Sequence, residues 1–316
     1  MHALVTGVSG FIGRRLTTLL LQNGWHVSGT SRHPVCIDGV SWHYWDLTTQ
    51  PDPALFTGID VIFHLAGKAH ALSESRQHDH EYELINHGGT ERLLQAAHQA
   101  GVQRIIYFSS VKAIANRAND SHADDTPYGR SKRRAEQLLL TSGLVAQPVI
   151  LRPVMVYGAT HKGNLPRMIR ASRRGLFPPL PDTGNRRSMV HVNDVAQAAL
   201  LLATHPEASN NSYIVTDGND YSIQQIQQWI RDALNLPPAR WSLPLPLLNL
   251  ASTIGDTIGK ISGSRLPFDS DTLDKLLGDA RYSSQPLQQL GFTPAHSLQE
   301  SMAEIVQFVL NDRGES

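Results

Sequence analysis

The stretch Thr6-Gly7-Val8-Ser9-Gly10-Phe11-Ile12-Gly13 decides the fold that the sequence predicts. It follows a short apolar run, residues 3–6, and leads into residues 11–22, where apolar side chains recur at helical spacing. In such a strand-to-helix turn the first glycine permits a tight turn, the second lets backbone amides approach a pyrophosphate, and the third lets the helix pack on the strand. The sequence therefore predicts a dinucleotide site at the start of this helix, formed by Gly7, Gly10, Phe11, Ile12 and Gly13.

Short β-rich runs alternate with helical patterns through the first half of the chain. The β-rich runs are residues 3–6, 26–30, 42–45, 61–65, 104–109 and 148–151, and helical spacing marks residues 11–22 and 82–100. This alternation is typical of an α/β fold built on a Rossmann doubly wound parallel sheet.

After residue 153 the pattern loosens, because residues 158–184 are rich in proline and most of the remainder is helical. We expect a smaller, discontinuous, α-rich lobe that binds substrate. Residues 1–160 plus about 185–205 would form the dinucleotide-binding domain, and about 161–184 plus 206–316 the lobe. The substrate would lie in the cleft between them.

Composition excludes several classes of function. The 28 basic and 28 acidic residues balance, so the chain as a whole has no electrostatic footprint for nucleic acid or an anionic membrane. The single cysteine, Cys36, suits a reducing compartment, and we expect a cytoplasmic protein. The most apolar segment, residues 243–258, is too short and polar to span a membrane, so we expect an amphipathic helix covering a core or a partner. The histidines form no recognised metal motif, and we expect no metal.

The end of the second predicted strand, Ser31-Arg32, bears on which dinucleotide binds. NAD sites usually place an acidic residue there for the ribose 2′-hydroxyl, whereas an arginine can receive the 2′-phosphate of NADP. The sequence therefore favours NADP(H), with NAD(H) possible, unless Arg32 only stacks on the adenine or faces solvent. Asp46 and Leu47 after the third strand, and Leu65-Ala66-Gly67 after the fourth, would lie beside the cofactor.

Tyr128 and Lys132 are the candidate acid and its partner. Residues four apart on a helix lie on the same face, so both side chains can point into one cleft. We expect the ammonium to stabilise the phenolate and lower the pKa of Tyr128. Such a tyrosine can give a proton to a carbonyl oxygen or take one from an alcohol. The alternative is an incidental pair on a surface helix.

In this context the chain resembles the extended short-chain dehydrogenase/reductase family, and within it the nucleotide-sugar epimerases, dehydratases and ketoreductases. The segments that carry the resemblance occur in family order: residues 6–13, 64–67, 86–90, 108–110, 128–132, 152–158 and 187–194. A closer likeness is to bacterial 4-ketoreductases of UDP-4-keto-6-deoxy-N-acetylglucosamine, which make UDP-N-acetylquinovosamine for surface polysaccharide. Residues 64–70, 185–188 and 216–220 carry that likeness.

The resemblance implies a catalytic triad of Ser110, Tyr128 and Lys132. Adjacent strand side chains point to opposite faces, so only one of Ser109 and Ser110 can face the substrate, and the family's spacing selects Ser110. Ile114-Ala115 replaces the family's Tyr-Gly pair, which leaves the following loop in doubt. The resemblance adds Asn86, Lys132, Pro153 and Val156 to the cofactor site. Substrate contacts are expected from Lys68, Ser110, Lys112, Asn164, Arg187 and Arg265.

The function expected from this sequence is NADPH-dependent reduction of the 4-keto group of a UDP-linked 4-keto-6-deoxy sugar, with the proton from Tyr128. One alternative is a UDP-hexose or UDP-N-acetylhexosamine 4-epimerase that retains NAD. A second alternative is a non-catalytic regulator that senses NADPH, although such a protein has no need of a proton donor. The expected partner besides the nucleotide sugar is a second copy of the chain in a homodimer.

Overall fold

The computed structural model describes residues 1–69, 76–115, 126–239, 241–262, 270, 273 and 277–311. Its centre is a seven-stranded sheet in the order β3-β2-β1-β4-β5-β6-β9, in which every neighbouring pair is parallel. The strands are β1 (His2–Thr6), β2 (His26–Ser31), β3 (Val40–Tyr44), β4 (Val61–His64), β5 (Arg104–Phe108), β6 (Gln147–Pro153) and β9 (Asn211–Val215). This order is that of a Rossmann fold, as the sequence predicts.

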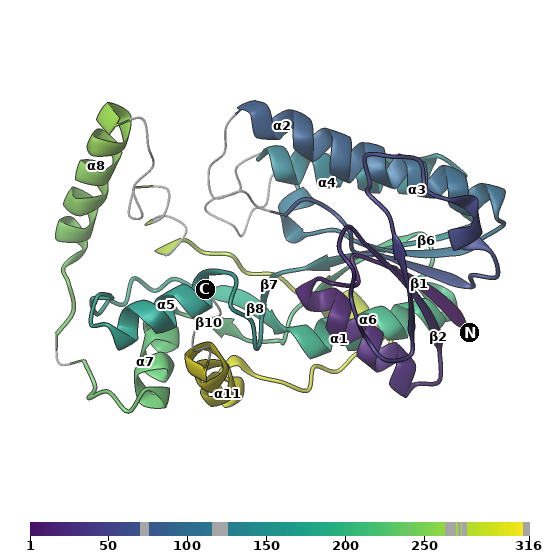
Figure 1. Cartoon of the computed structure of the whole chain (residues 1–316). Coiled ribbons are helices and arrows are strands. Elements are labelled where there is room, and N and C mark those ends of the chain that lie inside the picture. Colours follow the sequence, from purple (N-terminus) through teal and green to yellow (C-terminus); the bar gives the residue numbers. More distant parts are fainter. Residues whose placement is uncertain are drawn as a thin grey trace.

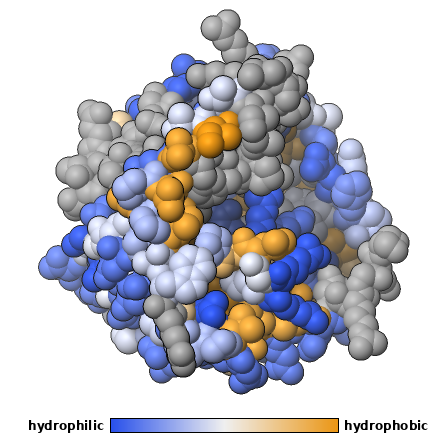
Figure 2. Space-filling model, turned by 90° about the vertical axis from the view of Figure 1, so that its left-hand side faces the viewer, coloured by the Kyte–Doolittle hydropathy of each residue, from blue (hydrophilic) through white to orange (hydrophobic). Residues whose placement is uncertain are grey.

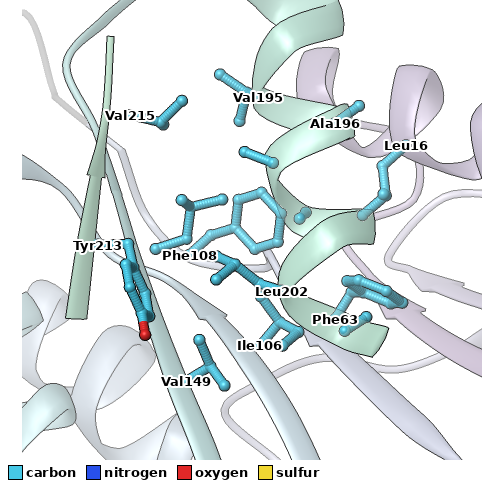
Figure 3. Close-up of a cluster of buried hydrophobic side chains, with 14 of the residues drawn as sticks. Leu16, Phe63, Ile106, Phe108, Val149, Val195, Ala196, Leu202, Tyr213 and Val215 are labelled. Carbon is cyan, nitrogen blue, oxygen red and sulfur yellow. The ribbon is translucent and has the colours of Figure 1, made fainter. Parts of the chain in front are cut away.

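Helices cover both faces of the sheet (Figure 1). On one face lie α1 (Phe11–Gln22) and α6 (Val192–Thr204); on the other lie α2 (Arg76–Tyr82), α3 (Gly88–Gln99) and α4 (Pro127–Thr141). Apolar side chains fill the space between the sheet and α6, among them Phe63, Ile106, Phe108 and Leu202 (Figure 3). Full burial of such a side chain contributes about 1.5–3 kcal/mol, so these contacts stabilise the packing of α6 on the sheet.

A second sheet has three strands in the order β10-β8-β7, and its first strand in the sequence starts just after β6 ends. Its strands are β7 (Met155–Tyr157), β8 (Arg187–His191) and β10 (Asp220–Tyr221). Near it lie α5 (Asn164–Arg173), α7 (Ile223–Ala233) and α11 (Leu298–Asn311), and α8 (Leu245–Ser262) stands farther out (Figure 1). The short helix α10 (Gln285–Gln289) packs instead against β9 of the large sheet. Tyr157, Ile169, Ile226, Ile230 and Met302 form a separate hydrophobic cluster there.

Two features differ from the sequence expectation. Strand β9 falls in the range expected to belong to the lobe, but it pairs in parallel with β6 and completes the large sheet. Sequence periodicity could not show this pairing, because it joins strands about sixty residues apart. The helix expected over residues 82–100 is interrupted by a π-helical turn at Glu83–His87. In the part of the chain that the structure describes, no helix combines the length and the hydropathy needed to cross a bilayer.

Candidate functional site

The glycine turn between β1 and α1 has the geometry that a dinucleotide needs. Gly7 has a φ of 74° and donates its N–H to Thr30 O at 2.9 Å. A Cβ on Gly13 would lie far inside van der Waals contact with the Gly7 carbonyl oxygen, so only glycine lets α1 approach so closely. A Cβ on Gly10 would meet only that same oxygen, at 3.1 Å, and otherwise open space. The start of α1 is therefore accessible, and its amides and dipole suit a pyrophosphate.

The loop after β4 closes against this turn and against α4. Ala66 N donates to Thr6 Oγ1 at 3.1 Å, and a Cβ on Gly7 would lie 2.9 Å from Ala66 N. A Cβ on Gly67 would lie 2.8 Å from Asn86 Oδ1 and 3.5 Å from Lys132 Nζ. The structure thus brings Gly7, Ala66, Gly67, Asn86 and Lys132 into one place.

Asn86 lies in the π-helical turn and uses its side chain within the protein. Its Oδ1 accepts from Lys68 N at 2.7 Å, and its Nδ2 donates to Lys68 O at 3.1 Å and to Ser131 Oγ at 3.0 Å. A π turn of this kind is frequent at functional sites because it redirects one side chain. Asn86 fixes the loop after β4 relative to α4, and any direct contact with a cofactor remains a prediction.

The loop that follows β2 holds the residues expected to distinguish the dinucleotides. Ser31 Oγ donates to His33 O at 2.6 Å and accepts from Trp42 Nε1 at 2.8 Å, while Arg32 is exposed. Asp46 accepts from Thr48 N at 2.8 Å and from Thr48 Oγ1 at 2.7 Å. These bonds, with a smaller contribution from the charge of Arg32, lower the pKa of Asp46.

The remaining predicted cofactor residues pack on both faces of the sheet. The Leu47 side chain packs over Gly89, where a Cβ would come within 2.8 Å of it. Leu65, Val156 and Ile12 pack against the cluster under α6, and Pro153 ends β6. Phe11 reaches the second sheet, because a Cβ on Gly158 would lie 3.1 Å from its Cζ.

Tyr128 and Lys132 lie in the first two turns of α4, and both are buried. The helix begins at Pro127 because Thr126 caps it, with Thr126 Oγ1 accepting from Gly129 N at 3.1 Å. Lys132 Nζ donates to Phe108 O at 2.8 Å and lies 4.6 Å from the centroid of the Tyr107 ring. Ser110, the serine selected by the family's spacing, forms a side-chain hydrogen bond with Tyr128. The three predicted catalytic side chains therefore converge.

The charge states of this pair differ from the sequence expectation. Burial raises the pKa of Tyr128 to about 12, the hydrogen bond from Ser110 opposes that rise, and Tyr82 adds to it. Burial lowers the pKa of Lys132 to about 8, against the opposing effect of Glu136. The predicted lowering of the Tyr128 pKa by Lys132 is wrong for this state, since the ammonium binds Phe108 O rather than the phenol. Tyr128 is thus protonated at neutral pH and ready to donate.

An ion pair that sequence reasoning missed fixes α4 to the sheet. Arg152 on β6 binds Glu136 through two hydrogen bonds, Nε to Oε1 at 2.8 Å and a terminal nitrogen to Oε2 at 2.6 Å. Glu136 is buried one turn after Lys132. The four-residue spacing of Lys132 and Glu136 was the available signal that Glu136 lies on the buried face of the helix. No pattern in the neighbouring sequence identified Arg152 as its partner.

The two lysines expected to contact substrate differ in setting. Lys68 pairs with Glu81, and its Nζ lies 5.4 Å from the centroid of the Tyr82 ring. Tyr82 in turn packs edge-on against Tyr128, with ring centroids 5.9 Å apart. Lys112 contributes backbone: a Cβ on Gly129 would clash with its carbonyl oxygen, which explains the glycine that follows Tyr128.

The substrate residues expected from the second half of the chain are placed in part. Asn164 is the exposed first residue of α5, and Arg187 is the half-buried first residue of β8. Arg265 lies outside the described residues. His191 caps α6 by accepting from Asn193 N, and Asp194 accepts from His296 Nδ1 at 2.8 Å, so both residues have structural roles here. Among the residues described, no group of three or more His, Cys, Asp and Glu side chains could hold a metal.

His64 beneath the loop after β4 makes stability depend on pH. Its Nδ1 is 2.8 Å from Thr6 Oγ1 and its Nε2 is 3.1 Å from Thr90 Oγ1, and burial, helped by the charge of Lys132, lowers its pKa to about 3. In the unfolded chain His64 binds a proton below about pH 6.5, whereas in the folded chain it stays neutral down to about pH 3. Stability therefore falls as the pH drops from about 6.5 towards 3. The His64 contribution to this loss should be about 2 kcal/mol between pH 7 and pH 5.

Urea unfolding at both pH values would measure the loss for the parent and for His64→Gln. The variant should be less stable at pH 7 and should lose about 2 kcal/mol less on acidification. His26→Gln, at an exposed position that starts β2, is the matched control. An unchanged pH dependence in His64→Gln would contradict the account.

Comparison with known proteins agrees with this geometry. The NAD dependent epimerase/dehydratase family matches residues 3–218. A UDP-glucose 4-epimerase of Vibrio cholerae is 31% identical over 97% of this chain and 95% of its own length. A 4-hydroxy-2-methyl-3-oxo-4-farnesyl-3,4-dihydroquinoline-1-oxide ketoreductase of Stigmatella aurantiaca is 27% identical over 82% of this chain and 80% of its own. The structure of MoeE5 in complex with UDP-glucose and NAD has a TM-score of 0.75 and 26% identity, and 98% of each chain is covered.

The chain therefore belongs to the NAD-dependent epimerase/dehydratase family, the extended short-chain dehydrogenase/reductases, and is an enzyme. The fold class and the enzymatic nature expected from the sequence are confirmed. The likeness to 4-ketoreductases of 4-keto-6-deoxy sugars and the preference for NADP(H) remain predictions.

Proposed function

We propose that this enzyme catalyses reversible hydride transfer at C4 of the sugar of a UDP-sugar. The observation that carries the proposal is the convergence of Ser110, Tyr128 and Lys132 beside the glycine turn, in a chain 26% identical to a protein solved with UDP-glucose and NAD. A nicotinamide dinucleotide, when bound, supplies or accepts the hydride. Gly7, Gly10 and Gly13 would hold its pyrophosphate at the start of α1.

The protein's own residues would handle the proton and the orientation. Tyr128, kept protonated by burial, donates to the oxygen on C4 when a ketone is reduced and takes the proton back when an alcohol is oxidised. Ser110 orients the same oxygen by hydrogen bonding. Lys132, held by Phe108 O, places a charge near the site, and Asn164 and Arg187 at the starts of α5 and β8 would hold the nucleotide diphosphate.

The first candidate within this chemistry is a UDP-sugar 4-epimerase. The support is the Vibrio cholerae UDP-glucose 4-epimerase, which aligns over 97% of this chain at 31% identity. Such an enzyme retains its nicotinamide and needs no added reductant. The second candidate is the NADPH-dependent reductase of a UDP-4-keto-6-deoxy sugar. It is favoured by the loop after β2, where Ser31 and the exposed Arg32 stand in place of an acidic residue.

One pair of assays separates the candidates. The purified enzyme is incubated with UDP-glucose or UDP-N-acetylglucosamine without added cofactor, and separately with UDP-4-keto-6-deoxy-N-acetylglucosamine and NADPH. Epimer formation in the first assay supports the epimerase. NADPH oxidation in the second assay, without epimer formation in the first, supports the reductase. Inactivity in both, with the cofactor bound, would refute C4 chemistry on UDP-sugars.

Arg32→Gln tests the cofactor choice directly. If Arg32 pairs with the 2′-phosphate, the variant should bind NADPH about 10–100-fold more weakly, the value expected for a lost charge-assisted hydrogen bond, and should bind NADH as before. Fluorescence titration with both cofactors measures the two dissociation constants. Arg134→Gln, which removes an exposed arginine on α4, is the control. Equal effects on NADPH and NADH would show that Arg32 does not read the 2′-phosphate.

A further inference from the structure

Exposed apolar side chains are concentrated on the side of the molecule where α8 lies. Twelve large hydrophobic side chains are exposed among the described residues, and six of them belong to α8 or to segments next to it: Leu176, Trp241, Leu245, Leu247, Leu250 and Ile254. Figure 2 shows an orange stripe on the upper half of this side, where α8 lies in Figure 1. Contiguous exposed apolar surface of this kind marks an interaction site.

The exposed leucine and isoleucine side chains of α8 do not take part in packing this helix against the rest of the protein. Leu248, Ser252 and Gly255 form its inward face, and Leu248 packs with Leu180 and Ile223. Leu247, Leu250 and Ile254, spaced three and four residues apart, point the opposite way and are 51%, 58% and 51% exposed. We call these three residues the α8 face. The helix is thus anchored on one side and presents a second apolar face to its surroundings.

Positive charge is concentrated in the stretch of chain that contains α5. Residues 160–187 contain seven Lys and Arg but one acidic residue, although the whole chain is neutral. Arg167, Arg173 and Arg174, here called the α5 basic cluster, are exposed along α5 and just after it. The chain then passes through Leu176, which is 72% exposed, to Pro179, whose carbonyl accepts from Leu243 N at 2.9 Å. The basic cluster is thereby linked to the segment that leads into α8.

We propose that the α8 face and the α5 basic cluster together dock on an anionic phospholipid bilayer. Aliphatic side chains on one face of a helix, a tryptophan in the segment before it and exposed arginines on a linked helix are the parts of an interfacial membrane site. The charge favours this occupant, because anionic headgroups are complementary to the exposed arginines of the α5 basic cluster. The neutral composition of the chain conceals this site because the compensating acidic residues lie elsewhere.

The test is cosedimentation of the full-length protein with vesicles. The protein should bind vesicles of phosphatidylglycerol and phosphatidylethanolamine at 0.1 M salt, bind phosphatidylcholine vesicles far more weakly, and be released from anionic vesicles at 0.5 M salt. Leu247→Ser with Leu250→Ser and Ile254→Ser should weaken binding at least about tenfold. Replacing the three arginines of the α5 basic cluster with Gln should weaken it about fivefold per charge.

Leu140→Ser, at an exposed leucine on α4, is the matched control and should bind vesicles like the parent. Unchanged thermal unfolding and C4 activity on a soluble UDP-sugar show that the α8 variant is folded, and they keep this test separate from that of the proposed function. The proposal is overturned if the parent stays in the supernatant with anionic vesicles, binds phosphatidylcholine equally well, or is unaffected by the α8 substitutions. It is also overturned if those substitutions dissociate a lipid-free dimer in sedimentation velocity while the parent binds no vesicles, since the face would then join two copies.

Discussion

Replacing Tyr128 with phenylalanine should lower kcat by about 10²–10⁴-fold, the usual contribution of a positioned general acid. Affinity for the nicotinamide dinucleotide should stay within about threefold of the parent, because the glycine turn and the loop after β4 do not depend on the hydroxyl. The loss follows from the surroundings of the phenol. Burial raises its pKa to about 12, so at neutral pH it carries a proton, and Ser110 forms a hydrogen bond with its hydroxyl.

The matched control is Tyr213→Phe, which makes the same chemical change at a buried tyrosine of β9 in the same sheet. The Tyr213 hydroxyl donates to Glu207 O at 3.5 Å, so its removal should leave kcat nearly unchanged. Steady-state kinetics and cofactor titration on both variants give the comparison. If Tyr128→Phe kept the parent's kcat, the proton would come from another group, and the proposed roles of Ser110 and Tyr128 would both fail.

The parts of this site that the sequence predicts are those that local chemistry determines. Gly7 and Gly13 were found because a tight turn and a close helix require them, and Tyr128 with Lys132 because residues four apart share one face of a helix. The Arg152–Glu136 pair could not be found in this way, because it joins β6 to α4 across the tertiary fold. The pairing of β9 with β6 was missed for the same reason.

The direction of the Tyr128 pKa shift needed the structure as well. Spacing alone predicted an ammonium beside a phenolate. Two features of the tertiary structure reverse the expected lowering of the Tyr128 pKa. Both side chains are buried, and the Lys132 ammonium donates to the Phe108 carbonyl oxygen. Desolvation raises a tyrosine pKa when no cation contacts the hydroxyl, so burial prevails here.

Gly13→Ala should reduce affinity for the nicotinamide dinucleotide by about 10–100-fold and lower the free energy of unfolding by about 1–3 kcal/mol, the range for overpacking a close contact. The new Cβ would overlap the Gly7 carbonyl oxygen, which is backbone and cannot rotate aside as a flexible side chain could. Either α1 moves away from β1 or the turn opens. Both changes displace the amides at the start of α1, so binding and stability fall together.

Gly88→Ala at the start of α3 provides the control for adding one methyl group to a helical glycine. Its φ is −63°, and the nearest obstacle to a Cβ is the end of the flexible Arg92 side chain, at 3.3 Å. That variant should be as stable as the parent or more stable by up to about 1 kcal/mol, because alanine favours helix, and should bind cofactor normally. Fluorescence titration and thermal unfolding of both variants make the test. A Gly13→Ala protein that unfolds earlier yet binds cofactor as tightly as the parent would mean that this turn supports the fold without holding the pyrophosphate.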